Sequence, residues 1–291
     1  MRTAELVDFM FAREARRKYH HDHKVSAVPE PDEILDTYRF CNVLRNDDRV
    51  TKWLHDNWLA RWRTELHGWF PFAVARCAIN RIDTMAAIEK YLMPWKPEQV
   101  RRVLKERRAQ GLTIYGAAYM IGTQGNAGDK VDFLIDKVLT PLWKNRLCFP
   151  CDTGFTHSKQ ASLAVAHEWL QSHYAVGSFT AAQVLADWKY ANGQNWRDFD
   201  TFAASGPGSR RGLNRVLNQP LNNTWDEKVF RTQLGILRNS VLPLIKHDRH
   251  IKNITAQDLQ NCLCEFDKYE RARLGEGRPK QIYTPHKEDE A

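Results

Sequence analysis

The clearest structural signal in this sequence is the segment Tyr174-Ala-Val-Gly-Ser-Phe-Thr-Ala-Ala-Gln-Val-Leu-Ala-Asp187. A helical run from Ser162 to Ser172 precedes it, a turn falls at Gly177, and a second apolar helix starts at Thr180. A glycine turn at a helix N-terminus can present backbone N–H groups to a phosphate. The pattern predicts a helix–hairpin–helix element that contacts a nucleic-acid backbone through Gly177, Ser178 and Thr180. An ordinary helix–turn–helix corner is the alternative.

Helical periodicity covers nearly the whole chain, and strand signals are weak. The predicted helices span residues 3–18, 33–46, 50–63, 70–80, 84–91, 97–110, 130–144, 210–217, 225–239 and 255–271, besides the two of the hairpin. We therefore expect an all-α fold built around the helix–hairpin–helix element.

Composition divides the chain into three expected parts. Residues 1–31 form a basic helix and a His-rich linker, and residues 32–275 form a helical catalytic domain with its hairpin near 162–190. Residues 276–291 are rich in Gly, Pro and charge, which predicts a flexible tail.

The charge balance points to a polyanionic partner. The 291 residues carry a net charge of +8, with basic runs at 13–24, 96–108 and 268–280. The hydrophobic content of 43% predicts a packed protein rather than a disordered one. No apolar run approaches the ~20 residues of a membrane span, and the N-terminus lacks a signal-peptide core. We expect a cytoplasmic protein without a membrane partner.

The six cysteines show no secreted disulfide framework. Cys148 and Cys151 with Cys262 and Cys264 offer four thiolates for zinc, but a C-x-C pair is unusual in zinc ribbons. We expect free, mostly buried thiols and no bound metal.

A second glycine-rich turn, Gly206-Pro-Gly-Ser-Arg-Arg-Gly212, is dense in anion donors. Glycines permit positive φ angles that align N–H groups into an anion nest, and arginines form paired hydrogen bonds with phosphate oxygens. The predicted anion site comprises Gly206, Gly208, Ser209, Arg210, Arg211 and Arg215, with Lys130 from a separate Gly-rich loop as a helper. The alternative is a capped loop with surface arginines. No nucleotide-binding G-x-x-x-x-G-K-[ST] motif occurs in the sequence.

Carboxylates lie between the two glycine turns. Asp198 and Asp200 are the candidate catalytic groups, while Asp187 lies within a helix and can pair with Lys189. Helix capping is an equally good explanation for each carboxylate alone. A further polar set at helical spacing, formed by Arg39, Asn42, Arg45 and Arg49, can line a pocket, with Asn214 as a further pocket residue. A salt-bridged surface helix is the default alternative.

Several segments in combination resemble one known family. They are Tyr38-Arg-Phe-Cys-Asn-Val-Leu-Arg with Asp48-Arg49, Arg76-Cys-Ala-Ile-Asn80, Gly116-Ala-Ala-Tyr-Met-Ile121, Gly177-Ser-Phe, Gly206-Pro-Gly-Ser-Arg-Arg-Gly-Leu-Asn-Arg215 and Leu263-Cys-Glu-Phe-Asp-Lys-Tyr-Glu-Arg271. They look like the α-glutamyl/putrescinyl thymine pyrophosphorylases, phage enzymes also called amino acid:DNA transferases. That family is similar to helix–hairpin–helix DNA glycosylases and shares a helical domain with phage hydroxymethyluracil DNA kinases.

The resemblance implies a transferase that acts on double-stranded DNA containing modified thymine. After a kinase has pyrophosphorylated hydroxymethyluracil, such an enzyme displaces pyrophosphate with an amine or amino acid and forms a carbon–nitrogen bond. The glycine–arginine turn would hold the pyrophosphate, and Asp198 or Asp200 would take the proton of the amine. The base would be flipped out of the duplex. No cofactor is implied, and Mg²⁺ beside the pyrophosphate is left open.

Two other functions fit the same residues. The first is a monofunctional DNA glycosylase acting on a modified pyrimidine, in which an aspartate assists cleavage of the sugar–base bond. A glycosylase/lyase is disfavoured because the position of its lysine, two residues after Gly177, is Phe179. The second is a non-catalytic DNA-binding protein that uses the same basic surface.

Overall fold

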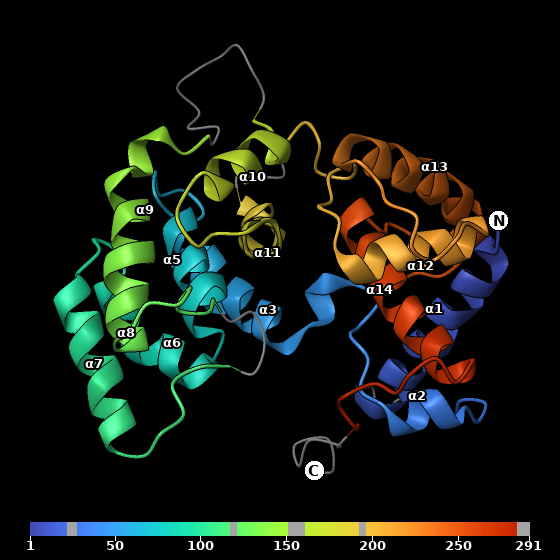
Figure 1. Cartoon of the computed structure of the whole chain (residues 1–291), viewed down its shortest axis with the longest axis horizontal. Helices are drawn as coiled ribbons and strands as arrows, with labels where there is room; N and C mark the ends of the chain where they lie inside the picture. Colours follow the sequence, from blue (N-terminus) through green and yellow to red (C-terminus); the bar gives the residue numbers. More distant parts are fainter. Residues whose placement is uncertain (22–27, 117–120, 151–160, 192–195, 284–291) are drawn as a thin grey trace. The chain divides into compact units, whose positions relative to one another are not determined.

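The computed structural model describes residues 1–21, 28–116, 121–150, 161–191 and 196–283. Within these residues the secondary-structure elements are helices (Figure 1). The one β feature there is an isolated bridge between Tyr38 and Ile282. The predicted all-α class is confirmed.

The chain forms two compact units that are discontinuous in sequence. Unit 1 comprises Met1–Asp48 and Asp200–Ala291, and unit 2 comprises Arg49–Phe199. This grouping differs from the division expected from composition, because the N-terminal helix packs into unit 1 instead of standing apart. The C-terminal segment is also tied to unit 1, since Tyr283 N donates to Thr37 O at 2.9 Å.

Unit 1 is a cluster of helices around a single apolar core. The core is formed by Leu6 and Met10 of the first helix together with Leu234, Leu263 and Phe266, all 1% exposed or less. Leu6 and Met10 lie four residues apart and therefore share one helix face. The elements are α1 (Thr3–His21), α2 (Glu33–Thr37), η1 (Arg45–Asp47), α12 (Pro207–Leu217), α13 (Glu227–Ile245) and α14 (Ala256–Arg273).

Helix α2 is much shorter than the predicted helix 33–46. Tyr38 leaves the helical region with φ −108° and ψ 146°, and the chain continues in an extended form until η1. Side chains of α14 satisfy the main chain there: Glu265 accepts from Cys41 N at 2.8 Å, and Asp258 accepts from Arg45 N at 2.9 Å. These tertiary hydrogen bonds replace the intrahelical ones, so the prediction of a helix over 38–46 is wrong.

Unit 2 holds the remaining helices, several of which join into longer ones through a π-helical turn. Examples are the continuous helices 49–62 and 130–144. The elements are α3 (Arg49–Leu54), η2 (His55–Leu59), α4 (Ala60–Trp62), α5 (Trp69–Val74), η3 (Ala75–Ile79), α6 (Ile82–Ile88), η4 (Glu89–Tyr91), α7 (Pro97–Ala109), α8 (Lys130–Phe133), η5 (Leu134–Leu139), α9 (Thr140–Lys144), η6 (Arg146–Cys148), α10 (Leu163–Gln171) and α11 (Ser178–Trp188).

Unit 2 contains a buried ion pair. Arg76 of η3 and Asp187 of α11 are both fully buried, with Nε and Oδ2 2.5 Å apart. Arg76 also donates to Thr51 Oγ1 at 2.9 Å and to Asn80 Oδ1 at 2.5 Å. Because an unpaired charge is costly to bury, this network fixes α3, η3 and α11 relative to one another within the unit. Asp187 therefore has Arg76 as its buried partner, which its position beside Lys189 in the sequence did not indicate.

Candidate functional site

Two helices joined by a turn occupy the segment predicted as a helix–hairpin–helix element, and the second helix begins two residues before the predicted Thr180. Helix α10 ends at Gln171, the chain turns, and α11 begins at Ser178 with Gly177 as its N-cap (Figure 1). No side chain caps the N-terminus of α11, and a Cβ atom added to Gly177 would meet no atom within 4 Å. The N-terminus of α11 therefore has no side-chain cap, and the helix dipole there favours an anion.

Hydrogen bonds of His167 hold the turn on one side, and two aromatic side chains near the turn are exposed to solvent. His167 of α10 lies 2.9 Å from Ser178 O through its Nε2, and Gln171 contacts the other ring nitrogen at 3.0 Å. On the outer side Tyr174 is 55% exposed and Phe179 is 56% exposed. Two exposed aromatic rings thus flank the uncapped helix end.

Asp198 is held against the start of α10. Its carboxylate accepts from Leu163 N at 2.7 Å, from Ala164 N at 3.0 Å and from Ser162 Oγ at 2.9 Å. This arrangement is a helix cap, the alternative that the sequence left open.

Asp200 is the first residue of the second segment of unit 1, and it is more exposed to solvent than Asp198. Its side chain is 59% exposed, and its nearest cation is Arg238 Nη2 at 3.9 Å. Its main-chain oxygen accepts from Ala256 N at 2.8 Å, which places the residue beside the start of α14.

The glycines of the second turn do not form the predicted anion nest. Gly206 has φ −142°, and among the described glycines only Gly111, Gly125, Gly128, Gly275 and Gly277 have positive φ. A Cβ atom on Gly208 would lie 2.8 Å from Cys264 Sγ, and one on Gly212 would lie 2.1 Å from Leu263 O. Gly208 and Gly212 therefore let α12 pack tightly on α14 (Figure 1).

The arginines of α12 are paired with carboxylates. Arg210 donates to Glu227 at 3.0 Å and to Ser205 Oγ at 2.7 Å. Burial acts to raise the pKa of Glu227, but hydrogen bonds from Ser205 and Arg210 outweigh it and lower that pKa. Ser209 is fully buried and accepts from Gly206 N at 2.9 Å, so it caps α12.

Arg211 and Arg215 share two carboxylates near the end of α12. Asp267 of α14 lies 3.3 Å from Arg211 Nε and 2.8 Å from Arg215 Nε, and Glu276 is hydrogen-bonded to Arg215. Arg215 is buried, whereas the side chain of Arg211 is 38% exposed. An incoming anion would have to replace Glu276 or Asp267 to reach these guanidinium groups, and Glu227 to reach Arg210.

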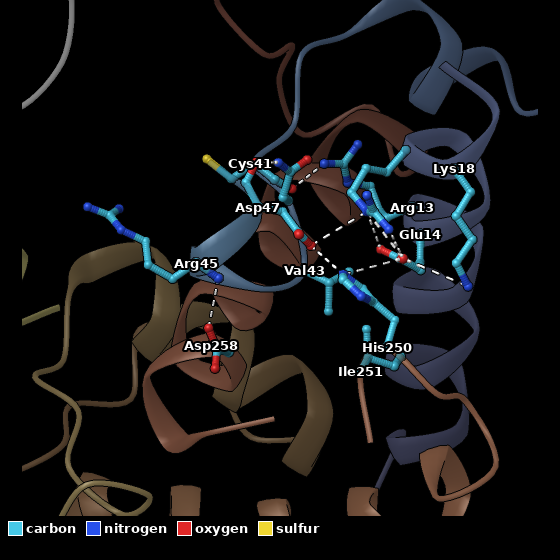
Figure 2. A network of polar contacts seen from close by, with 12 residues as sticks. Arg13, Glu14, Lys18, Cys41, Val43, Arg45, Asp47, His250, Ile251 and Asp258 are labelled. Atoms are coloured by element: carbon cyan, nitrogen blue, oxygen red, sulfur yellow. Dashed lines mark hydrogen bonds and ion pairs between the residues drawn. The ribbon is translucent and has the colours of Figure 1, made fainter. Parts of the chain in front are cut away.

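The pocket residues expected on one helical face are spread along the extended segment 38–44 and beyond it. Arg39 is exposed, Asn42 donates to Asp47 O at 2.8 Å, and the side chain of Arg45 points away from Asp47 (Figure 2). Asn214 is buried in α12, where it donates to Leu221 O and accepts from Trp225 Nε1 at 2.6 Å. Asn214 therefore stabilises the turn after α12.

Lys130 begins α8 in unit 2, after the Gly-rich loop. Its ammonium lies 4.6 Å from the ring centroid of Tyr115, and burial lowers the pKa of Lys130. Burial also raises the pKa of Tyr115 to about 12. A partly desolvated cation over a neutral phenol ring is compatible with binding an anion.

One group of side chains in unit 1 has the composition of a metal site. Glu14, Asp47 and His250 each offer a ligand atom within 4.8 Å of the others (Figure 2). Arg17 donates to Glu14 at 2.6 Å and lies 3.5 Å from Asp47, so a cation already balances both carboxylates. The group is best described as a hydrogen-bonded ion cluster.

The described cysteines are free thiols. Burial raises the pKa of Cys77 and of Cys264 to about 12, which makes both thiols unreactive at neutral pH. Cys151 of the considered zinc set lies outside the described residues.

The sequence interpretation missed two features of these regions. Arg76 was recognised only within a family motif, although an Arg and an Asp inside apolar helical runs already suggest a buried ion pair. Glu227 was missed because 22 residues separate it from Ser205, and no local pattern links them.

Residues 4–278 match the family model described as 5-hmdU DNA kinase, helical domain, so the chain belongs to this family. The 5-hmdU DNA kinase of Bacillus phage SP10 is 25% identical to it over 269 residues, which cover 82% of this chain and 40% of that protein. The chain thus spans about two fifths of the length of the curated relative it matches. No solved structure matches the chain. In its described part, no helix combines the length and apolar character needed to cross a membrane.

Proposed function

We propose that the chain is a phage DNA-hypermodification enzyme that displaces pyrophosphate from 5-pyrophosphoryloxymethyluracil in DNA with an amine. Membership of the helical-domain family and similarity to a 5-hmdU DNA kinase support a role on modified thymine. An amino acid or polyamine is the proposed co-substrate, and the kinase acts first.

The uncapped N-terminus of α11 carries this proposal. The open turn at Gly177, with Ser178 and Thr180 in the first helical turn, is suited to one phosphate of the DNA backbone. The exposed rings of Tyr174 and Phe179 are suited to contact with sugars or unstacked bases. In this role the hairpin would act like that of DNA glycosylases, which flip their target base out of the duplex.

The proposed pyrophosphate site is the first turn of α12. Arg210 and Arg211 supply its partly exposed cations, whereas Gly208 packs on α14 and Ser209 caps the helix with Gly206. Pyrophosphate would replace Glu227 on Arg210 and Glu276 on Arg211, with Arg215 behind them. Lys130 lies in unit 2 and is not assigned to this site. Its greater negative charge favours this exchange, and charge stabilisation of a leaving group is usually a large catalytic contribution.

Asp200 is the proposed base for the attacking amine because its carboxylate is exposed and weakly paired. An alkylamine with a pKa of about 10.4 must lose a proton at pH 7, which costs roughly 4.6 kcal/mol without assistance. Asp198, whose oxygens accept three hydrogen bonds at the start of α10, is not proposed as the base.

The second candidate function is a monofunctional glycosylase, favoured by the same hairpin and by a carboxylate, Asp198, held at the start of α10. Incubation with pyrophosphorylated DNA separates the two functions. Amine-dependent release of pyrophosphate without strand lability supports the transferase. Abasic sites that form without amine support the glycosylase instead. Asp200→Asn should slow the transferase far more than it weakens DNA binding.

A further inference from the structure

The basic runs seen in the sequence are largely neutralised in the structure. In α7, Arg101 and Lys105 pair with Asp132, and Arg107 and Arg108 pair with acidic residues of neighbouring elements. The end of α1 and the last turns of α14 show the same pattern. Their pairs are Arg16–Asp36, Arg17–Glu14, Lys18–Asp248, Lys268–Glu265, Arg271–Asp267 and Arg273–Glu270.

The loop between α13 and α14 behaves differently. Lys246, His247, Arg249 and Lys252 are all exposed. Among the described residues none of the three cations, Lys246, Arg249 and Lys252, has an acidic partner within 4 Å. The one acidic residue of the loop, Asp248, pairs with Lys18 of α1 at 3.4 Å. The loop therefore presents uncompensated positive charge.

This loop is also held in one conformation. Asp248 Oδ1 accepts from His250 N at 2.8 Å and from Ile251 N at 3.1 Å. His250 Nε2 lies 2.6 Å from Asp47 Oδ2, and Ile251 is fully buried (Figure 2). Burial acts to raise the pKa of Asp248, but these backbone hydrogen bonds and Lys18 outweigh it and lower that pKa.

The anchored and exposed residues divide the loop by function. Asp248, His250 and Ile251 anchor the loop within unit 1. Residues 246, 247, 249 and 252 are exposed to solvent. Cations on a fixed loop bind an extended polyanion with little loss of conformational freedom in the loop itself. A charged loop that served only to keep the protein in solution would not require these anchoring hydrogen bonds.

We propose that Lys246, Arg249 and Lys252 form a contact surface for the phosphate backbone of duplex DNA. The surface lies in unit 1 and is separate from the hairpin of unit 2. The inference rests on the proposed DNA substrate but not on the chemistry performed there. An acidic protein segment is the alternative partner for such a positively charged surface. DNA is favoured because a DNA-modifying relative matches the chain.

Salt titration of DNA binding tests this surface. Each neutralised phosphate contributes about 0.9 to the slope of log K against log salt. The triple variant Lys246→Gln, Arg249→Gln, Lys252→Gln should therefore lower the slope by about 2–3 on an unmodified duplex. Arg249→Gln alone should lower it by about 0.9. The matched control Lys90→Gln, Arg102→Gln, Lys137→Gln removes the same charge from exposed positions of unit 2 and should leave the slope unchanged.

Three results would overturn the inference. These are an unchanged slope in the triple variant, an equal loss in the control variant, or a polyglutamate competitor that binds the wild type more tightly than DNA does. Circular dichroism checks that each variant is folded. The assay needs neither amine nor pyrophosphorylated base, so a protein that shows the slope change but no transfer would refute only the proposed function.

Discussion

Gly212 of α12 lies directly against the main chain of Leu263 in α14, where an added Cβ atom would come within 2.1 Å of the carbonyl oxygen. Gly208 makes the corresponding approach to Cys264 one helical turn earlier. Two family motifs, the glycine–arginine turn and the segment beginning at Leu263, are thus packed against each other. The four-residue spacing of these glycines follows from helix packing, not from phosphate binding.

Gly212→Ala should destabilise unit 1 by about 1–3 kcal/mol because a main-chain oxygen cannot move aside without shifting a helix. Urea denaturation measures this change. Gly235→Ala in α13 is the matched control, because its new Cβ would meet nothing within 4 Å. That control should stabilise the protein by about 0.5–1 kcal/mol. Equal effects at both positions would contradict the packing role of Gly212.

Asp187→Ala should destabilise the protein by about 3–5 kcal/mol, because it leaves the buried Arg76 uncompensated. The double variant Arg76→Met, Asp187→Leu removes both charges and should recover much of that loss. The comparison requires equilibrium denaturation of Arg76→Met, of Asp187→Leu and of the double variant. Additive effects of the two single substitutions would show that the pair is not energetically coupled.

Glu270 should make stability depend on acid pH. Burial acts to raise its pKa, but hydrogen bonds from Arg273 and Arg2 outweigh it and lower the pKa below 4.5. The carboxylate therefore stabilises the fold above the unfolded pKa, and this contribution is lost as pH falls through the folded value.

Thermal unfolding between pH 7 and pH 3 measures the effect of Glu270. The Tm of Glu270→Gln should lie below that of the wild type at neutral pH, and the two should converge in acid. A Tm difference that stays constant down to pH 3 would assign the effect of the substitution to packing alone.

Gly177→Asp should separate folding from DNA binding at the hairpin. Gly177 has φ −78° and ψ 168°, which an aspartate N-cap adopts readily, and the position is open. The substitution should preserve or raise the Tm while placing a negative charge at the proposed phosphate position. DNA affinity should fall at least tenfold, whereas Gly177→Ser should leave it nearly unchanged. Retained affinity in Gly177→Asp would exclude backbone contact there.

The helices of this fold were largely predictable from the sequence because their apolar residues follow helical spacing. Residues 97–110 and 130–144 were predicted to within one residue at each end, compared with the structure. Residues 38–46 were mispredicted, since their backbone is satisfied by side chains of α14 more than 200 residues away. No local pattern carries that information.

The candidate site was less predictable for the same reason. The turn at Gly177 is a local element, and its position followed from neighbouring residues, although the helix after it begins at Ser178 and not at the predicted Thr180. The environment of the arginines in α12 depends on Glu227, Asp267 and Glu276, which come from later segments. Residue type and spacing could not reveal that these cations are already paired.

The most direct test of the proposed reaction is mass spectrometry of nucleosides from pyrophosphorylated DNA incubated with this protein and a mixture of amines. Our account predicts a nucleoside whose mass equals that of thymidine carrying an amine at its methylene carbon, formed together with free pyrophosphate. It also predicts that Asp200→Asn loses this product while still binding DNA. Recovery of free modified base with abasic DNA, and no amine adduct, would contradict the account and identify a glycosylase.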